Sequence, residues 1–288
     1  MPLAASELIL NADGSIYHLN LLPQDIAKTI ITVGDPERVS DVSKHFDKVE
    51  VKKEKREFHT HTGIVNGKRI SVISTGIGTD NIDIVFNELD ALVNIDFTTR
   101  TEKTKKTRLD FIRIGTSGAI QLNIPIDSFL LTETAIGLDG LMHFYKKKIF
   151  ENQNFSDKLI AFLKWESHNI TPYVFDCSPD LANSLKSNRI RFGTTVTNAG
   201  FYGPQGRSIR LNPKLEDFHQ KLSSFKSQGK QITNLEMETA GIYGLAKLLG
   251  HRAVSMNAIL ANRATGEFSN NPSKTVEELI KYCLEKIS

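Results

Sequence analysis

Short runs of apolar, often β-branched residues alternate along the chain with longer stretches in which apolar residues recur at helical spacing. The short runs predict six strands, at Thr29–Val33, Arg69–Thr75, Asp110–Gly115, Ser128–Thr132, Ile190–Thr197 and Arg252–Ala261. The longer stretches predict helices at Asp80–Val93, Glu236–Leu249 and Ser273–Ile287, the last with Ser273 as N-cap. This alternation predicts one α/β domain over residues 1–288, a three-layer α/β/α sandwich around a central mixed sheet.

Composition excludes several classes of protein. Apolar residues make up 40% and charged residues 24%, which excludes a disordered or low-complexity chain. No apolar run reaches the roughly 18 residues of a transmembrane helix, and the first ten residues lack the positive segment of a secretion signal. Cys177 and Cys283 fit neither a metal motif nor a disulfide framework. We therefore expect a reduced, cytoplasmic protein without a membrane partner.

Basic charge is concentrated in one segment. The formal net charge is only +3, yet residues 100–108 (RTEKTKKTR) hold five basic residues and one acidic residue. A protein that binds nucleic acid usually spreads basic charge over a face, so no nucleic-acid partner is expected. We interpret the segment as a solvated surface loop, with a site for an anionic partner as the alternative.

Two Gly-containing motifs follow predicted strands, at the edge where open α/β sheets bind ligands. In Val33–Arg38 (VGDPER), Gly34 lets the backbone approach an anion and Pro36 suits the first turn of a helix, with Arg38 one turn in. The alternative is a plain strand-turn-helix with a surface Arg. Ser74–Thr79 (STGIGT) is either a phosphate cradle or a tightly packed turn.

Three further motifs carry charge. Strand alternation puts Arg113 on an apolar face, where it needs an anion, either a bound phosphate or a structural carboxylate. The loop 201–207 (FYGPQGR) presents an aromatic ring, an amide and a guanidinium, a set that suits a planar heterocycle. Glu236 and Glu238 precede a helix, where one could accept hydrogen bonds from a vicinal diol or both could favour the helix dipole.

In this order, GDPER, KREF (Lys55–Phe58), STGIG, RIGTSGAIQ, FYGPQGR and NLEMETAGIY resemble the nucleoside phosphorylase-I superfamily (PNP-UDP phosphorylases), and most its uridine phosphorylase branch. The resemblance runs from about residue 16 to the C-terminus. It implies a nucleoside phosphorylase fold and a pentosyltransferase of pyrimidine salvage. That enzyme would cleave uridine reversibly with phosphate, a co-substrate, to give uracil and ribose 1-phosphate.

The same resemblance implies roles for individual residues. Phosphate would be bound by Gly34, Arg38, Arg113 and Thr116, and by Arg56 of a neighbouring subunit. Ribose would be bound by Met237, Glu238 and a neighbouring subunit's His18. The base would contact Phe201, Gln205, Arg207 and Arg263. Of these, the resemblance implies catalytic roles for Arg113, Gln205, Arg207 and Glu238.

The resemblance also implies a homodimer, or a hexamer as a trimer of dimers, with residues 1–22 contributing to a neighbouring site. No cofactor is implied, although bacterial relatives bind a monovalent cation such as potassium at a dimer interface, and Glu57, Ile77 and Asn81 match its ligands. Asn81 stands where those relatives have Ser, and FYGPQGR replaces their usual FYPGQER. Residues 98–109 form a polar insertion to which the superfamily assigns no role.

Other activities are open at this point. A purine-specific phosphorylase would place an Asp after the last core strand, where this chain has Asn262-Arg263. A nucleoside hydrolase would need a carboxylate that activates water, whereas this chain offers several Arg residues that suit phosphate. A catalytically silent nucleoside-binding protein is the alternative from another class, because fold does not fix function.

Overall fold

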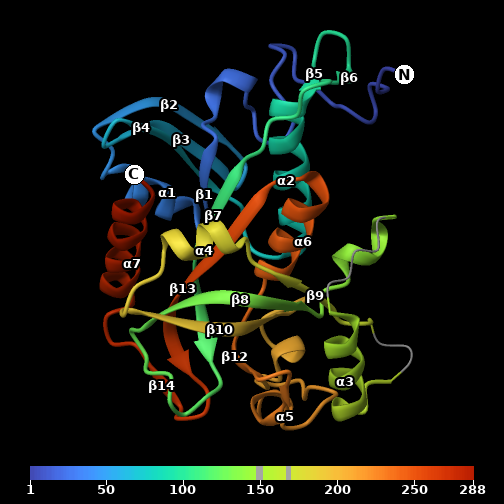
Figure 1. The fold of residues 1–288 in the computed structure, drawn as a ribbon, viewed down its shortest axis with the longest axis vertical. Coiled ribbons are helices and arrows are strands. Elements are labelled where there is room, and N and C mark those ends of the chain that lie inside the picture. Colours follow the sequence, from blue (N-terminus) through green and yellow to red (C-terminus); the bar gives the residue numbers. More distant parts are fainter. Residues whose placement is uncertain (147–151, 167–169) are drawn as a thin grey trace.

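A twisted mixed sheet runs through the molecule, with helices on both faces (Figure 1). The structure is a computed structural model and describes residues 1–146, 152–166 and 170–288. In spatial order the sheet contains β11 (Lys226–Ser227), β12 (Lys230–Glu236), β10 (Ile190–Thr197), β8 (Phe129–Gly137), β13 (Arg252–Asn262), β7 (Asp110–Ala119), β1 (Thr29–Val33), β4 (Lys68–Ser74), β3 (Phe58–Val65) and β2 (Lys48–Lys55). Both parallel and antiparallel pairs occur, which confirms the predicted mixed sheet.

Short strands and helices complete the fold. Beside the main order, β9 (Tyr173–Asp176) pairs with β8, β14 (Glu267–Phe268) pairs with β13, and β5 (Ile95–Asp96) pairs with β6 (Thr101–Glu102). The helices are α1 (Pro36–Ser43), α2 (Thr79–Asn94), α3 (Gln153–Leu163), α4 (Pro179–Ser184), α5 (Phe218–Ser224), α6 (Thr239–Leu249) and α7 (Pro272–Ile287). None of the described helices combines the length and apolarity that crossing a lipid bilayer requires.

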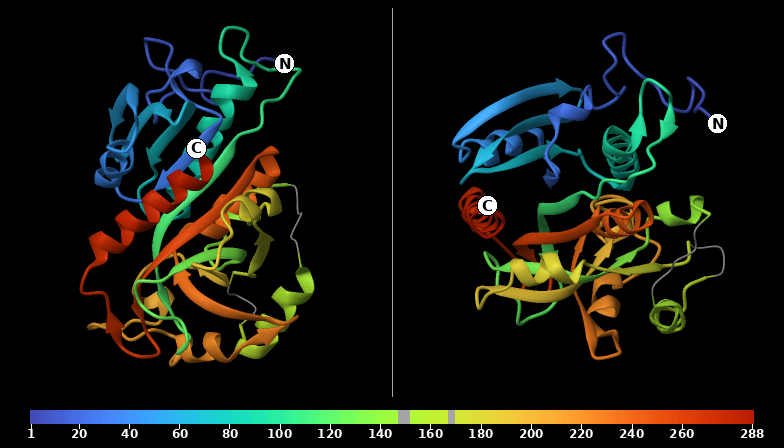
Figure 2. Two further views of the ribbon diagram at one scale, coloured as in Figure 1. Left: turned by 60° about the vertical axis from the view of Figure 1, so that its left-hand side comes forward. Right: turned by 45° about the horizontal axis from the view of Figure 1, so that its top comes forward.

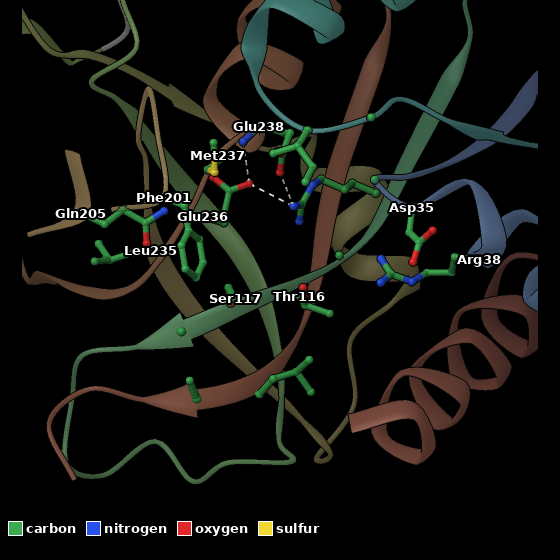
Figure 3. Close-up of a pocket in the computed structure, with 18 of the residues that line it drawn as sticks. Asp35, Arg38, Thr116, Ser117, Phe201, Gln205, Leu235, Glu236, Met237 and Glu238 are labelled. Carbon is green, nitrogen blue, oxygen red and sulfur yellow. Dashed lines mark hydrogen bonds and ion pairs between the residues drawn. The ribbon is translucent and has the colours of Figure 1, made fainter. Parts of the chain in front are cut away.

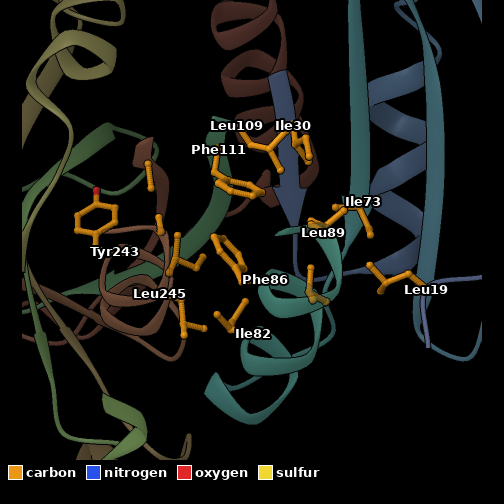
Figure 4. Packing of buried hydrophobic residues seen from close by; sticks show 14 of the residues in the cluster. Leu19, Ile30, Ile73, Ile82, Phe86, Leu89, Leu109, Phe111, Tyr243 and Leu245 are labelled. Atoms are coloured by element: carbon orange, nitrogen blue, oxygen red, sulfur yellow. The ribbon is translucent and has the colours of Figure 1, made fainter. Parts of the chain in front are cut away.

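Alternation along the central strands creates two apolar layers. Ile30 and Phe111 belong to the cluster under α2 and α6, where the rings of Phe86 and Phe111 have centroids 4.3 Å apart (Figure 4). Their strand neighbours, Ile31 and Ile112, belong to the cluster under α1, α4 and α7. Because each strand is buried on both faces, the layers fix its register. The three-layer α/β/α arrangement is therefore confirmed (Figure 2).

Half of the sheet closes on itself. β12 pairs antiparallel with β7 through Asn234 and Leu235, opposite Ala119 and Gly118, while β12 also continues through β10, β8 and β13 back to β7. The sequence did not indicate this closure. It sets the end of β12, which pairs with β10, beside the last residues of β7, and so joins motifs that lie more than a hundred residues apart.

Strand bounds agree closely with the pattern of apolar residues, and helix starts agree less well. β1 and β10 have the predicted bounds, and β7 and β8 continue several residues further. Ser273 is not an N-cap: α7 begins at Pro272, its N-cap is Asn271, and no side chain caps it. Glu236 is not helical either, because it ends β12 and α6 begins at Thr239.

The basic segment is partly structural. Arg100 donates hydrogen bonds to the carbonyl oxygens of Leu3, Ala4 and Leu8, at 2.7, 2.9 and 2.5 Å, and so holds the N-terminal segment against the β5–β6 hairpin. Lys103 donates to the Val93 carbonyl at 3.0 Å. The expectation of a solvated loop is therefore wrong for these two residues. The exposed remainder includes Lys105 and Arg108.

Candidate active site

A cavity of about 720 Å³ lies along the second half of β7, beside the ends of β1 and β12 and the loop that follows β10 (Figure 3). It brings together residues of all the sequence motifs described above. Its lining residues include Gly34, Asp35, Arg38, Glu57, Gly76, Ile77, Asn81, Arg113, Thr116, Ser117, Phe201, Gln205, Arg207, Glu236, Met237 and Glu238. In Figure 3, Arg38 lies at one end, Phe201 and Gln205 at the other, and Glu236 to Glu238 between them.

The first end of the cavity is built by the turn from β1 into α1. Pro36 starts the helix as predicted, and Asp35 accepts a hydrogen bond from the Glu37 amide at 2.9 Å, which caps it. Burial lowers the pKa of Arg38, and the positive charge of nearby Arg113 lowers it further, against the raising effect of Asp35. Two guanidinium groups that repel one another in a cavity favour an anion between them.

The place of Arg113 depends on a glycine. Arg113 is almost fully buried, and its side chain lies along β7 over Gly115. A Cβ atom at Gly115 would come within 1.9 Å of Arg113 Nη1. The Arg-x-Gly spacing of this motif is therefore sterically required. The guanidinium of Arg113 occupies the space that a side chain at position 115 would fill.

Two carboxylates and an amide hold this guanidinium. Arg113 Nη2 lies 2.6 Å from Glu238 Oε2 and 3.2 Å from Glu236 Oε2, while Nη1 donates to Asn257 Oδ1 at 3.0 Å. Burial tends to lower the pKa of Arg113, but Glu236 and Glu238 outweigh it and the pKa is raised. The structure therefore contains the carboxylate partners that the sequence left as one of two alternatives.

Glu236 and Glu238 have different hydrogen-bond partners and different structural roles. Glu236 Oε2 accepts hydrogen bonds from the amides of Glu238 and Thr239, at 3.0 and 2.9 Å, and so holds the turn from β12 into α6. Glu238 Oε1 accepts one from the Gly78 amide at 2.9 Å, which gives the STGIG turn a role in holding this side chain. Burial raises the pKa of Glu238, and Glu236 adds to this against the lowering effect of Arg113. Glu238 is thus a buried acid that faces the cavity.

The other end of the cavity is formed by the loop after β10. Arg207 Nη1 donates to Gln205 Oε1 at 2.5 Å, and the Arg207 guanidinium lies 3.9 Å from the centroid of the Phe201 ring. Burial, with a contribution from Arg263, lowers the pKa of Arg207 to about 10. An aromatic ring, an amide and a guanidinium are thereby assembled around one space, as the sequence predicted.

Arg263 lies on the outer side of this loop and does not line the cavity. Its guanidinium donates to the carbonyl oxygens of Gln205 and Gly206, the latter at 3.1 Å. In this structure it braces the loop backbone, and direct contact with a base stays a prediction.

Besides Arg263, two more predicted residues lie outside the cavity of their own subunit. His18 and Arg56 do not line it, yet both lie next to Tyr17: the His18 ring is 4.8 Å from the Tyr17 ring, and Arg56 is 5.9 Å from it. His18 Nδ1 lies 2.6 Å from Glu88 Oε1, whose carboxylate also accepts the His18 and Leu19 amides. These residues form one ordered surface patch, and their contact with a second subunit stays a prediction.

The residues that match a cation site also lie together. Glu57, Ile77 and Asn81 line the same edge of the cavity, and a Cβ atom at Gly76 would meet both Asn81 and Glu57. One carboxylate, one carbonyl and one amide oxygen suit a hard monovalent cation by ligand type. Cation binding stays a prediction.

Several site residues were missed by the sequence analysis. Asn257 and Ser255 hold Arg113 from β13, at 3.0 and 3.4 Å, and Leu260, Ala261 and Phe268 also line the cavity. The sequence signal that could have identified Asn257 is its place within the apolar strand 252–262, because a buried amide needs hydrogen-bond partners.

Comparison with known proteins agrees with this site. A family model described as the phosphorylase superfamily matches residues 28–287. The chain belongs to this superfamily. Among superfamily relatives, a uridine phosphorylase of Thermococcus kodakarensis is 33% identical over 266 residues, which cover 91% of this chain and 83% of the relative. A uridine phosphorylase of Haemophilus influenzae is 31% identical, with 91% and 93% covered.

A solved superfamily structure is also similar throughout. It is a nucleoside phosphorylase of Trypanosoma brucei, described as showing uridine phosphorylase activity. It is 28% identical to this chain, with a TM-score of 0.87 over 97% of this chain and 99% of that one. The phosphorylase fold is thereby shown for nearly the whole chain.

Proposed function

We propose that the chain is a uridine phosphorylase, a pentosyltransferase that converts uridine and phosphate to uracil and ribose 1-phosphate. The observation that carries the proposal is the order of groups along the cavity: Arg38 lies at one end, the buried Glu238 with its partner Arg113 in the middle, and Gln205 with Arg207 at the other. A nucleoside with an attacking phosphate has the same order of anion, diol and base.

Phosphate binds at the first end in this proposal. Arg38, Arg113, Thr116 and the backbone at Gly34 offset its charge and hold one oxygen beneath C1′. That oxygen forms the new bond to C1′ while the bond from C1′ to the uracil nitrogen breaks. Arg113 is also paired with Glu238 at 2.6 Å, so one guanidinium joins the phosphate to the carboxylate that holds the ribose.

The remaining groups hold the sugar and stabilise the leaving base. Glu238 accepts hydrogen bonds from the ribose hydroxyls, and Met237 packs beside the sugar. The electron pair of the broken bond goes to uracil, whose growing negative charge is stabilised by Gln205 and Arg207 while Phe201 packs on the ring. No covalent enzyme intermediate is needed, since positioning supplies much of the acceleration.

A second subunit completes the site in this proposal. The patch of Tyr17, His18 and Arg56 lies outside the subunit's own cavity, so we assign His18 to the ribose and Arg56 to the phosphate of a neighbouring subunit in a homodimer or hexamer. Potassium at Glu57, Ile77 and Asn81 would add positive charge near that boundary. Apart from such an ion, the reaction as proposed uses only residues of the protein.

The experiment that tests the activity is uracil release from uridine with and without phosphate, alongside thymidine, inosine and adenosine. We expect phosphate-dependent release from uridine; equal release without phosphate would indicate a hydrolase, and faster cleavage of inosine a purine enzyme. We expect Arg38→Ala to raise the KM for phosphate about tenfold or more, since a charged hydrogen bond is lost. Arg191→Ala, at an exposed position of β10, is the matched control.

A purine activity is not favoured by the structure of the last core strand. Asn262 stands where the purine-specific phosphorylases of the superfamily have an Asp. Its amide donates to the carbonyl oxygens of Gln121 and Ile124 at 2.9 and 2.8 Å. Asn262 is buried and does not line the cavity. A side chain committed to the backbone in this way is not free to protonate a base.

A further inference from the structure

A belt of hydrogen bonds links the strands of the closed half of the sheet. This half consists of β7, β13, β8, β10 and β12 in spatial order, and the pairing of β12 with β7 completes the circle. Each bond of the belt joins side chains of neighbouring strands, and all of its residues are buried. In order, the belt is Arg113 (β7), Asn257 (β13), Thr132 (β8), Thr195 (β10), Asn234 (β12) and Ser117 (β7).

The guanidinium of Arg113 fixes the direction in which the belt begins. Arg113 has only N–H donors, so the atom of Asn257 that lies 3.0 Å from its Nη1 is the amide oxygen. The amide nitrogen of Asn257 then donates to Thr132 Oγ1 at 3.3 Å. If the amide turned over, its NH₂ group would face the N–H donors of Arg113, and both would lose an acceptor.

The next bonds keep the same direction. Thr132 Oγ1 and Thr195 Oγ1 lie 2.6 Å apart, and Thr195 Oγ1 donates to Asn234 Oδ1 at 2.9 Å. Because the Thr195 proton is used there, Thr132 is the donor of the 2.6 Å bond. Asn234 Nδ2 donates to Ser117 Oγ at 2.9 Å. In this direction Thr132 and Thr195 each accept one bond and donate one, whereas the reverse direction would leave the Thr132 proton without an acceptor.

Asn257 is a neutral partner within a charged cluster. Arg113 Nη2 lies 2.6 Å from Glu238 and 3.2 Å from Glu236, so one positive charge already faces two carboxylates. A third carboxylate at position 257 would make the cluster more negative and oppose the binding of an anion beside it. An amide oxygen holds the guanidinium without adding charge.

We propose that this belt positions Arg113 for phosphate. Asn257, Thr132 and Thr195 are positioning residues: they lock the amide that holds Nη1 in one orientation, and they add no negative charge at the phosphate site. Asn234 closes the belt onto β7. The inference rests on the proposed function, because it requires that phosphate binds at Arg113.

Thr195→Val breaks the belt with little change of shape. It removes the acceptor of the Thr132 hydroxyl, so the orientation of the Asn257 amide is no longer fixed. We expect the dissociation constant of phosphate, measured by titration calorimetry, to rise about fivefold, which corresponds to the loss of one hydrogen bond. Uracil affinity is expected to be unchanged. Thr195→Ser restores the hydroxyl and should keep most of the phosphate affinity.

Thr60→Val is the matched control for this substitution. Thr60 is buried on β3, and its Oγ1 has no hydrogen-bond partner in the described structure. We expect it to bind phosphate as the unmodified protein does. A belt that only stabilises the barrel would lower the melting temperature of Thr195→Val and leave phosphate binding unchanged. That outcome, or an equal loss of phosphate affinity in Thr60→Val, would overturn the proposal.

Asn257→Asp tests the need for a neutral partner. The carboxylate has nearly the same shape and still accepts from Arg113, but it adds a negative charge and cannot donate to Thr132. We expect phosphate affinity to fall about tenfold or more, because like charges repel, while uracil affinity persists. Asn257→Leu loses the acceptor without adding charge and should lose less. Unchanged or tighter phosphate binding in Asn257→Asp would refute the proposal.

These binding measurements separate the role of the belt from the proposed activity, since none of them requires catalysis. An unmodified protein that binds phosphate and uracil without cleaving uridine would refute the proposed function, and the variants would still test the belt. An unmodified protein that binds no phosphate would refute both.

Discussion

Gly115 controls the position of the residue on which the site depends. A Cβ atom there would lie 1.9 Å from Arg113 Nη1, and Arg113 is held by Glu236, Glu238 and Asn257, so it has little room to move. We expect Gly115→Ala to displace the guanidinium and to lower kcat/KM for uridine at least tenfold, or about 1.4 kcal/mol of transition-state binding. Steady-state rates at varied phosphate measure this effect.

The same strand supplies the control. At Gly118 an added Cβ meets Ala261 and Arg207 at 3.9 Å, an ordinary van der Waals distance. Gly118→Ala should therefore keep most of the activity. Similar losses in both variants would mean that β7 tolerates no side chain at either glycine, and would remove the specific link between Gly115 and Arg113.

In the proposed reaction, Glu238 gives ribose binding a dependence on pH. Burial first, and then the negative charge of Glu236, hold the pKa of Glu238 above its ordinary 4.5. Only the ionised carboxylate accepts both ribose hydroxyls, so affinity for uridine should fall about tenfold per pH unit once the pH drops below this raised pKa. Titration calorimetry of uridine without phosphate measures the effect free of phosphate ionisation.

Uracil is the control ligand for this pH profile, since it lacks the ribose and should not show the same loss. In Glu238→Gln the loss of uridine affinity on acidification should disappear. A midpoint at or below 4.5 in the unmodified protein would contradict a raised pKa for the ligand-binding carboxylate.

The position of a single residue was predictable where it depends on strand alternation or on a short sequence motif. Arg113 was expected on a buried face, and the loop 201–207 was expected to gather an amide, a ring and a guanidinium. The partners of Arg113 were not predictable, because Glu238 is 125 positions away and meets it only through the pairing of β12 with β7. Long-range pairing of this kind leaves no periodic signal in the sequence.

At the scale of elements, the six predicted strands were found because most of their residues are apolar and buried. β3 and β12 were missed although they are largely buried, because polar residues interrupt their apolar pattern. The outermost strand, β2, has the sequence KVEVKKEK, with charges that favour an exposed edge, and it was missed. Such charges protect an edge strand from pairing with other chains. The start of α6 was misjudged because Glu236 and Glu238 favour a helix start locally, whereas pairing with β10 keeps Glu236 in a strand.

The β5–β6 hairpin and the N-terminal segment should be stable only together. Arg100 donates three hydrogen bonds to backbone carbonyls of residues 3, 4 and 8. We expect Arg100→Ala to raise hydrogen exchange and proteolysis of the first ten residues while changing global stability by about 1 kcal/mol or less, because the segment is peripheral. Hydrogen-exchange mass spectrometry and thermal unfolding measure the two effects.

Lys105→Ala is the control for this anchoring, since Lys105 is an exposed lysine of the same basic segment. It should leave exchange at the N-terminus unchanged. Faster exchange in both variants would instead indicate that the overall charge of residues 100–108, and not the Arg100 contacts, orders the segment.

At the scale of the whole molecule, the fold assembles most of the proposed nucleoside site from one chain and leaves His18 and Arg56 on a separate surface patch. His18 is ordered by Glu88 at 2.6 Å, and Arg56 adopts a left-handed backbone conformation with φ of 55°, beside Tyr17. These side chains are held in place although they do not face the cavity of their own subunit. In a symmetric oligomer they would face the cavity of the partner subunit. This placement supports the proposed oligomer.

Mixing two inactive variants tests that arrangement directly. Glu238→Ala damages the cavity of the subunit that carries it, whereas Arg56→Ala removes the side chain that a subunit contributes to its neighbour's cavity. A homodimer of either variant should therefore be nearly inactive. In a mixed dimer, one site combines an intact cavity with an intact donor, and random mixing should restore about one quarter of normal activity. Co-expression with two affinity tags isolates the mixed species, whose activity should reach about one half. Two copies of the same variant, tagged in the same way, serve as the control and should stay inactive. If mixed dimers are as inactive as the parents, Arg56 acts within its own subunit or not at all.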